Sequence, residues 1–165
     1  MTGDVSERFD RLPQEATEKG ESREAILSWW DDRFGIDSTV FDAHTFWERG
    51  EGNIWVFYGE VPDPSPFDGL GMVCVRTSGH DWKPTTNAAQ RFGHHATRNV
   101  LEVGGDAIDR FVAGETQSIA WTGDRGYVLV ATEVAGERAI LGVGQHLDGE
   151  LRSVIPKGRR RDLLR

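Results

Sequence analysis

The stretch GYVLVATEVAGERAILGVGQHLDGELRSVIP, residues 126–156, decides the fold class of this chain. Its runs of valine, leucine and isoleucine are short and are divided by glycine turns. Such a pattern predicts several short strands rather than long helices. Further strands are expected at RNVLEVG and SIAWTG, with a short helix at DAIDRFVAGE between them. Short strands at regular spacing favour a small β-barrel for this half.

The first half has a different pattern. SREAILSWWDDRFG, residues 22–35, predicts a helix that Ser22 caps and Gly35 ends. HTFWERGEGNIWVFYGEV predicts a hairpin with its turn near residues 50–53, and LGMVCVRT predicts another strand. A second helix is expected from Thr85 or Thr86 onward. Residues 1–20 are charged and lack periodicity, which predicts a mobile tail.

Composition limits the kind of protein. The chain has 165 residues, is 38% hydrophobic and has a net charge of −8, which suits one or two compact units. It lacks an apolar run of membrane-spanning length and a secretory leader, so we expect a cytoplasmic protein without membrane contact. Only three of its 19 basic residues are lysine, a balance that resembles proteins of salt-loving organisms. The single cysteine, Cys74, excludes an internal disulfide and favours a buried thiol.

Basic residues concentrate in two islands. Residues 76–98 carry one acid and four bases, and residues 152–165 carry one acid and six bases, whereas the rest of the chain is acidic. Such islands predict contact with an anionic partner. If the second helix continued to residue 98, Arg91, His94, His95 and Arg98 would line one exposed stripe. The alternative is that both islands are solvated surface.

The second half resembles a known family. AIDRFVAGE, GYVLV and AILGVGQHLDGELRSVIPKGRRRDL are similar to the PUA-like RNA-binding domain at the C-terminus of Sun/Fmu-type 5-methylcytosine RNA methyltransferases. Gly126 to Val130, Leu141 to Gly144, Gly149, Leu151, Ser153, Pro156 and Lys157 stand at the positions of its motif. The resemblance implies that RNA lies across the short helix and the final strand.

The first half resembles the pre-PUA module of archaeal RNA-modification and ribosome-assembly proteins, through WWDDRFGIDSTVFDAHTFWERGEGNIWVF and KPTTNAAQRFGHHATRNVLEV. We therefore expect an α+β protein: a small N-terminal α/β pre-PUA module at residues 21–97, followed by a PUA-like β-barrel with a short helix and a basic C-terminus at residues 98–165.

A catalytic site is not expected. The methyltransferase would need a glycine-rich loop for S-adenosylmethionine and a Pro-Cys pair, but Cys74 lies between two valines and GVGQ lacks the third glycine. His94 and His95 are adjacent and have no further ligand at metal-binding spacing. We therefore predict neither a cofactor nor a metal.

The function expected is RNA binding in rRNA or tRNA modification or in ribosome assembly, with structured RNA rather than DNA as the partner. The candidate RNA-binding residues are Lys83, Thr85, Arg91, Arg98, Arg152, Lys157, Arg159, Arg160 and Arg161. Thr85 could offer a phosphate its hydroxyl or simply start a helix, and Trp82 could stack on a base or pack in the core. The rival is a protein-interaction adaptor for a separate methyltransferase or assembly factor.

Overall fold

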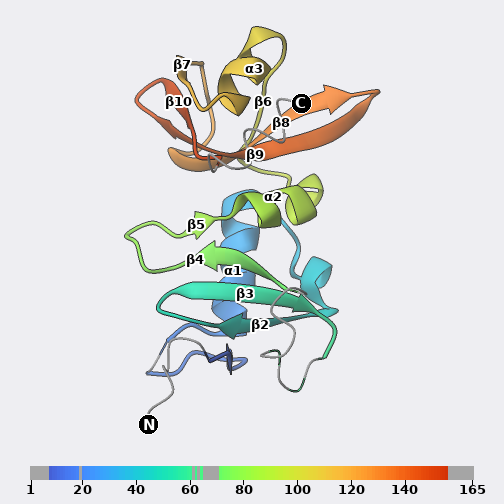
Figure 1. Ribbon diagram of the computed structural model, residues 1–165, viewed down its shortest axis with the longest axis vertical. Coiled ribbons are helices and arrows are strands. Elements are labelled where there is room, and N and C mark those ends of the chain that lie inside the picture. Colours follow the sequence, from blue (N-terminus) through green and yellow to red (C-terminus); the bar gives the residue numbers. More distant parts are fainter. Residues whose placement is uncertain (1–7, 19, 61, 63, 65–70, 156–165) are drawn as a thin grey trace.

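The computed structural model describes residues 8–18, 20–60, 62, 64 and 71–155. Two five-stranded sheets lie one above the other along the long axis of the molecule, with a helix, α2, between them (Figure 1). The strand orders are β1-β2-β3-β4-β5 and β6-β8-β9-β10-β7. Strands and three α-helices together give the α+β class that the sequence predicts.

The first sheet is antiparallel throughout. Its strands are β1 (Asp10–Arg11), β2 (His44–Glu48), β3 (Asn53–Tyr58), β4 (Met72–Arg76) and β5 (Lys83–Pro84). The predicted hairpin is confirmed as β2 and β3, in which Trp47 lies opposite Trp55. Gly52 in its turn has φ +79°, and an added Cβ would lie 2.8 Å from the Ser78 amide nitrogen. This position therefore requires glycine.

Helix α1 (Arg23–Phe34) begins and ends where the sequence predicts. The Ser22 hydroxyl accepts a hydrogen bond from the Ala25 amide at 3.1 Å, and Gly35 ends the helix at φ +63°. Ile26, Trp30 and Phe34, which recur at helical spacing, are fully buried. This face therefore holds α1 against the first sheet.

Part of the expected mobile tail is folded. Phe9 is buried against Trp55 and Phe57 at ring-centroid distances of 5.3 and 5.4 Å, and Leu12 is also buried. Strand β1 pairs with β2. The expectation of an unstructured segment is therefore wrong for residues 9–12, because aromatic burial here outweighs the charged composition.

Helix α2 (Thr86–Phe92) ends before residue 98, to which it would have to continue to form the predicted stripe of Arg91, His94, His95 and Arg98. A single 3-10 turn, η4 (Gly93–His95), follows it, and Ala96 is already extended. Ala89, Phe92 and Ala96, which recur at helical spacing, are buried. The helical stripe to residue 98 is wrong, because Gly93 packs tightly on the second sheet: an added Cβ would lie 3.0 Å from Cγ1 of Ile140.

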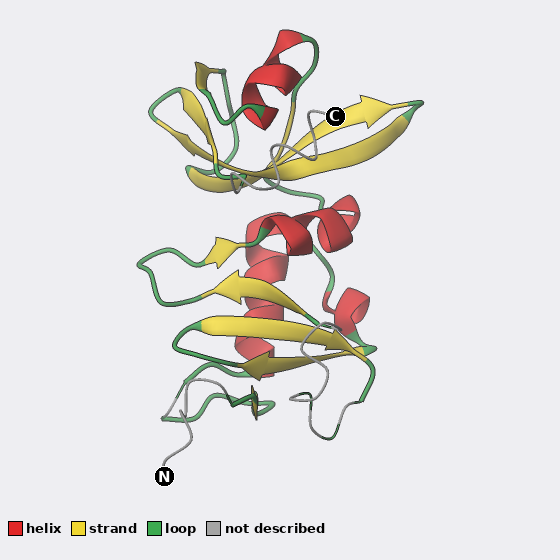
Figure 2. Cartoon of the chain, in the orientation of Figure 1, coloured by secondary structure: helices red, strands yellow, loops and turns green. Residues whose placement is uncertain are grey.

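The second sheet comprises β6 (Val100–Glu102), β7 (Thr116–Ser118), β8 (Gly126–Val134), β9 (Glu137–Leu147) and β10 (Glu150–Ser153). Only β6 and β8 pair in parallel. Helix α3 (Asp106–Val112) lies on one face, where Phe111 shares a core with Val128, Leu151 and Ile155 (Figure 2). The sheet stays open in the described residues, with β6 and β7 at its edges, so it is a partial barrel.

One hydrophobic core spans the junction. Leu129 of β8 and Val143 of β9 are buried together with Trp30, Phe92 and other residues of the first half. The two sheets therefore share apolar surface through α1 and α2. In the described part of the chain, none of the helices has the length and apolarity to cross a membrane.

Candidate nucleic-acid interface

The face of the second sheet that points away from α3 packs on the first half at Leu129 and Val143, and its remaining part, toward Arg152, is here called the outer face. Across its strands Tyr127 lies opposite Gln145, Gln145 opposite Arg152, and Arg152 opposite Thr116. Directly opposed residues project from the same face of a sheet, so these four form one cross-strand row. Arg152 and Thr116 are exposed, whereas Tyr127 and Gln145 are half-buried. The row is therefore accessible to a ligand.

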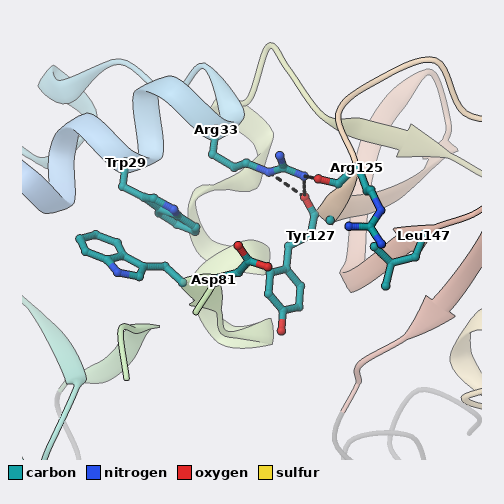
Figure 3. A pocket seen from close by; sticks show the side chains of 8 residues that line it. Trp29, Arg33, Asp81, Arg125, Tyr127 and Leu147 are labelled. Carbon is teal, nitrogen blue, oxygen red and sulfur yellow. Dashed lines mark hydrogen bonds between the residues drawn. The ribbon is translucent and has the colours of Figure 1, made fainter. Parts of the chain in front are cut away.

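A pocket of about 210 Å³ lies where the outer face meets the first half (Figure 3). It is lined by Trp29, Arg33, Asp81, Trp82, Arg125, Gly126, Tyr127 and Leu147. Leu147 also lines a shallower hollow of about 640 Å³ with Thr116, Gln145, Asp148, Glu150 and Arg152. We call the two together the junction groove, because they share Leu147 and follow the outer face.

Arg33 fixes one wall of the groove. Its Nε donates to the Tyr127 carbonyl at 2.9 Å, and its Nη2 donates to the carbonyls of Tyr127 and Arg125 (Figure 3). Burial lowers the pKa of the Arg33 guanidinium below its ordinary value, and nearby Asp124 opposes that shift. The donors of Arg33 are thus committed to holding β8 against α1.

Two other arginines of the groove are free. The side chains of Arg125 and Arg152 are exposed and make no hydrogen bond or ion pair with any other described residue. The Arg152 guanidinium lies close enough to Tyr127 to oppose a rise in the pKa of that phenol. Burial and the Asp81 carboxylate nevertheless raise the pKa of Tyr127. The phenol therefore keeps its proton and can donate a hydrogen bond.

Aromatic rings form the opposite wall. Trp82, which follows the β4–β5 loop, lies 6.0 Å from Trp29 of α1 between ring centroids. Both rings are half-buried, and both also border the shared core. Figure 3 shows the Asp81 carboxylate between Trp29 and the Tyr127 ring. The groove thus combines aromatic faces with three arginines and with the carboxylates of Asp81, Asp148 and Glu150.

Two predicted residues lie next to this groove. Lys83 forms β5 directly after Trp82 and is half-buried. The Thr85 hydroxyl accepts from the Ala88 amide at 3.1 Å and donates to the Val73 carbonyl at 2.6 Å. Thr85 is therefore the cap of α2, and its hydroxyl already has two partners. Trp82 proves to be both a core neighbour and a groove residue.

Arg91 and Arg98 lie elsewhere. Arg91 is close to His44, whose pKa is lowered by burial first and then by Arg91 and Arg23. His44 pairs with Tyr58, at the end of the first sheet opposite the β4–β5 loop. Arg98 donates to the Asp31 carbonyl at 2.9 Å. Arg91 and Arg98 therefore do not line one helical stripe as expected.

The C-terminal basic run is only partly visible. Arg152 lies on the outer face, because the neighbouring Leu151 and Ser153 are buried on the side toward α3. Lys157, Arg159, Arg160 and Arg161 lie outside the described residues. The final strand does pack against α3 as expected, but Arg152 points away from that helix.

Sequence reasoning missed most of the groove. Arg33, Arg125, Tyr127, Gln145 and Trp29 were not among the candidate RNA-binding residues. Strand alternation offered one signal, because Tyr127 and Arg152 alternate with the apolar residues of GYVLV and ELRSV. Their registration opposite Gln145 and the approach of α1 depend on tertiary packing. Among the described residues, no three His, Cys, Asp or Glu side chains come together as a metal site.

Comparison with known proteins assigns the second sheet. Residues 98–161 match a family described as the methyltransferase RsmF PUA domain. The C-terminal unit is PUA-like. Residues 1–71 match a family of unknown function (DUF7122). None of the curated proteins matches the chain.

The PUA-like unit is the part that indicates a function, since PUA domains bind RNA. Neither matched family is described as a catalytic domain. The junction groove combines three parts of the sequence: Trp29 and Arg33 from the first match, Asp81 and Trp82 from the unmatched segment, and Tyr127 with its neighbours from the PUA-like unit.

Proposed function

We propose that the chain is a non-catalytic RNA-binding protein that acts in rRNA or tRNA modification or in ribosome assembly. The observation that carries this is the outer face of the PUA-like unit, where Arg125 and Arg152, which have no ion pair or hydrogen-bond partner among the described residues, lie near Tyr127. Guanidinium groups bind phosphates through two parallel hydrogen bonds, and aromatic rings stack on bases. The partner proposed is structured RNA rather than DNA.

The acidic remainder suits this role. A net charge of −8 repels polyanions from most of the surface, so the groove and the basic C-terminus are the places where RNA can approach. Specific binding then requires shape and base contacts in addition to charge. This arrangement favours a selected RNA over bulk nucleic acid.

Binding to rRNA and tRNA fragments, measured by fluorescence anisotropy, tests the proposal. We expect micromolar or tighter binding to at least one fragment and weaker binding to a DNA duplex of the same sequence. Replacing Arg159, Arg160 and Arg161 with glutamate should weaken RNA binding relative to the wild-type protein, since the C-terminal run is proposed to contact phosphates. Lack of binding to every RNA tested would overturn the proposal.

The process is tested separately. Crosslinking the protein to RNA in its own cells, followed by sequencing, should recover rRNA or tRNA, and recovery of messenger RNA alone would contradict the proposed role.

Calorimetry with S-adenosylmethionine should give no heat of binding. Micromolar binding with methyl transfer to RNA would contradict the non-catalytic assignment.

A second candidate is an adaptor that binds a methyltransferase or an assembly factor and touches RNA little. Tyr58 favours it, because this ring on the first sheet is 71% exposed. Its neighbours His44 and Arg91 give that end of the sheet a polar rim. The adaptor would be supported if the wild-type protein bound no RNA while Tyr58→Ser abolished association with a purified methyltransferase.

A further inference from the structure

We propose that the pocket of the junction groove binds one unpaired RNA base, with its face against Trp82 and Tyr127 and its phosphate toward Arg125. This inference deepens the proposed function and rests on it. The structural basis is the assembly of half-buried rings from both halves of the molecule around one small opening.

The size of the pocket suits a single base. Its volume of about 210 Å³ is below the roughly 300–1,000 Å³ of sites for drug-sized ligands. A base within a duplex is stacked on both faces and cannot enter such an opening without leaving the helix. The pocket should therefore select single-stranded or flipped nucleotides over paired ones.

The walls are held before any ligand arrives. Arg33 of α1 donates to the Tyr127 and Arg125 carbonyls, which fixes the backbone beneath the Tyr127 ring. Trp29 packs edge-on against Trp30 at 4.9 Å and against Phe34 at 5.6 Å, both of which are fully buried. A base would therefore meet rigid aromatic faces, which lowers the entropic cost of stacking.

The charges around the opening are arranged for a nucleotide. Arg125 is free to meet a phosphate, and Arg152 extends the cationic side along the outer face. Asp81 lies at the rim, and among the described residues the ion-pair partner of its carboxylate is the exposed His80 at 3.4 Å. A carboxylate accepts from base amino and imino groups, and guanine presents two such donors side by side. The pocket should therefore prefer guanine to uracil.

Tryptophan fluorescence provides the test. Short single-stranded RNA of mixed sequence should quench the emission of the full-length protein, and the same RNA annealed to its complement should quench far less. Trp82→Phe should reduce the quenching to the share that comes from Trp29, which also lines the pocket, while largely keeping affinity, because phenylalanine still stacks. Trp55→Phe is the matched control: this half-buried tryptophan packs against Phe9 and Phe57 on the first sheet and does not line the groove, so its variant should keep the quenching.

Two substitutions measure the contacts themselves. Tyr127→Leu keeps apolar volume but loses the ring, and it should weaken affinity by roughly 5- to 150-fold, the range for removing one base–aromatic stack. Asp81→Asn should reduce the preference for a guanine-containing over a uracil-containing oligonucleotide. Circular dichroism and urea unfolding should show that both variants remain folded.

The outcomes separate the two proposals. If the wild-type protein binds RNA but single-stranded and duplex RNA bind equally and Tyr127→Leu has wild-type affinity, the base pocket is wrong and RNA binding stands. If the wild-type protein binds no RNA, both proposals fall. Quenching by single-stranded RNA that Trp82→Phe reduces and Trp55→Phe retains would establish the pocket.

Discussion

At the scale of residues, Arg33 joins the two halves through hydrogen bonds that sequence patterns could not reveal. Its guanidinium is half-buried, and its donors serve the carbonyls of Tyr127 and Arg125. Arg33→Met should lower the free energy of unfolding by about 2 kcal/mol, because charge-assisted hydrogen bonds contribute about 1.5–3 kcal/mol and a carbonyl is left unpaired. Urea denaturation measures this. Arg110→Met, at an exposed position of α3, should change stability by less than about 0.5 kcal/mol.

Cys74 shows the effect of burial on a single thiol. Desolvation raises its pKa to about 12, although the nearby Trp30 indole opposes that rise. A raised folded-state pKa keeps the thiol protonated, so stability should fall as pH rises above the ordinary thiol pKa of 9.0, where the unfolded chain loses its proton first. At pH 8 a thiol reagent should modify Cys74 only after denaturation. Rapid labelling of the native protein would contradict the buried position.

At the scale of elements, the two adjacent tryptophans of α1 have different surroundings. Trp30 is fully buried, so Trp30→Ala should cost about 3–5 kcal/mol of unfolding free energy. Trp29 is half-buried at the groove, so Trp29→Ala should cost less stability. Thermal unfolding compares the two variants. If neither changed the melting temperature, the packing of α1 described above would be wrong.

Local signals predicted most elements correctly. Ser22 and Gly35 set the ends of α1, and the glycine-containing turn set the β2–β3 hairpin, because caps and turns depend on neighbouring residues alone. The end of α2 was missed, because it depends on the contact of Gly93 with Ile140, 47 positions later in the chain. The groove was missed for the same reason: its residues converge only when α1 meets β8.

At the scale of the whole molecule, the shared core implies cooperative unfolding. Leu129 and Val143 of the PUA-like unit are buried in the core of the first sheet. Removing either half would expose this apolar surface, so we expect a single transition. Far-ultraviolet circular dichroism, which reports on both sheets, and tryptophan fluorescence should give coincident urea midpoints. Two separate transitions would show that the halves are energetically independent.

The central claim is that RNA binds on the outer face of the PUA-like unit, and the salt dependence of affinity tests it most directly. The double variant Arg125→Gln/Arg152→Gln should bind more weakly, and its slope of log affinity against log salt should flatten by about 0.7–0.9 for each phosphate that the variant no longer neutralises. Arg11→Gln is the control, since Arg11 pairs with Glu60 on the far edge of the first sheet. An affinity and a slope equal to the wild-type values in the double variant would contradict the claim.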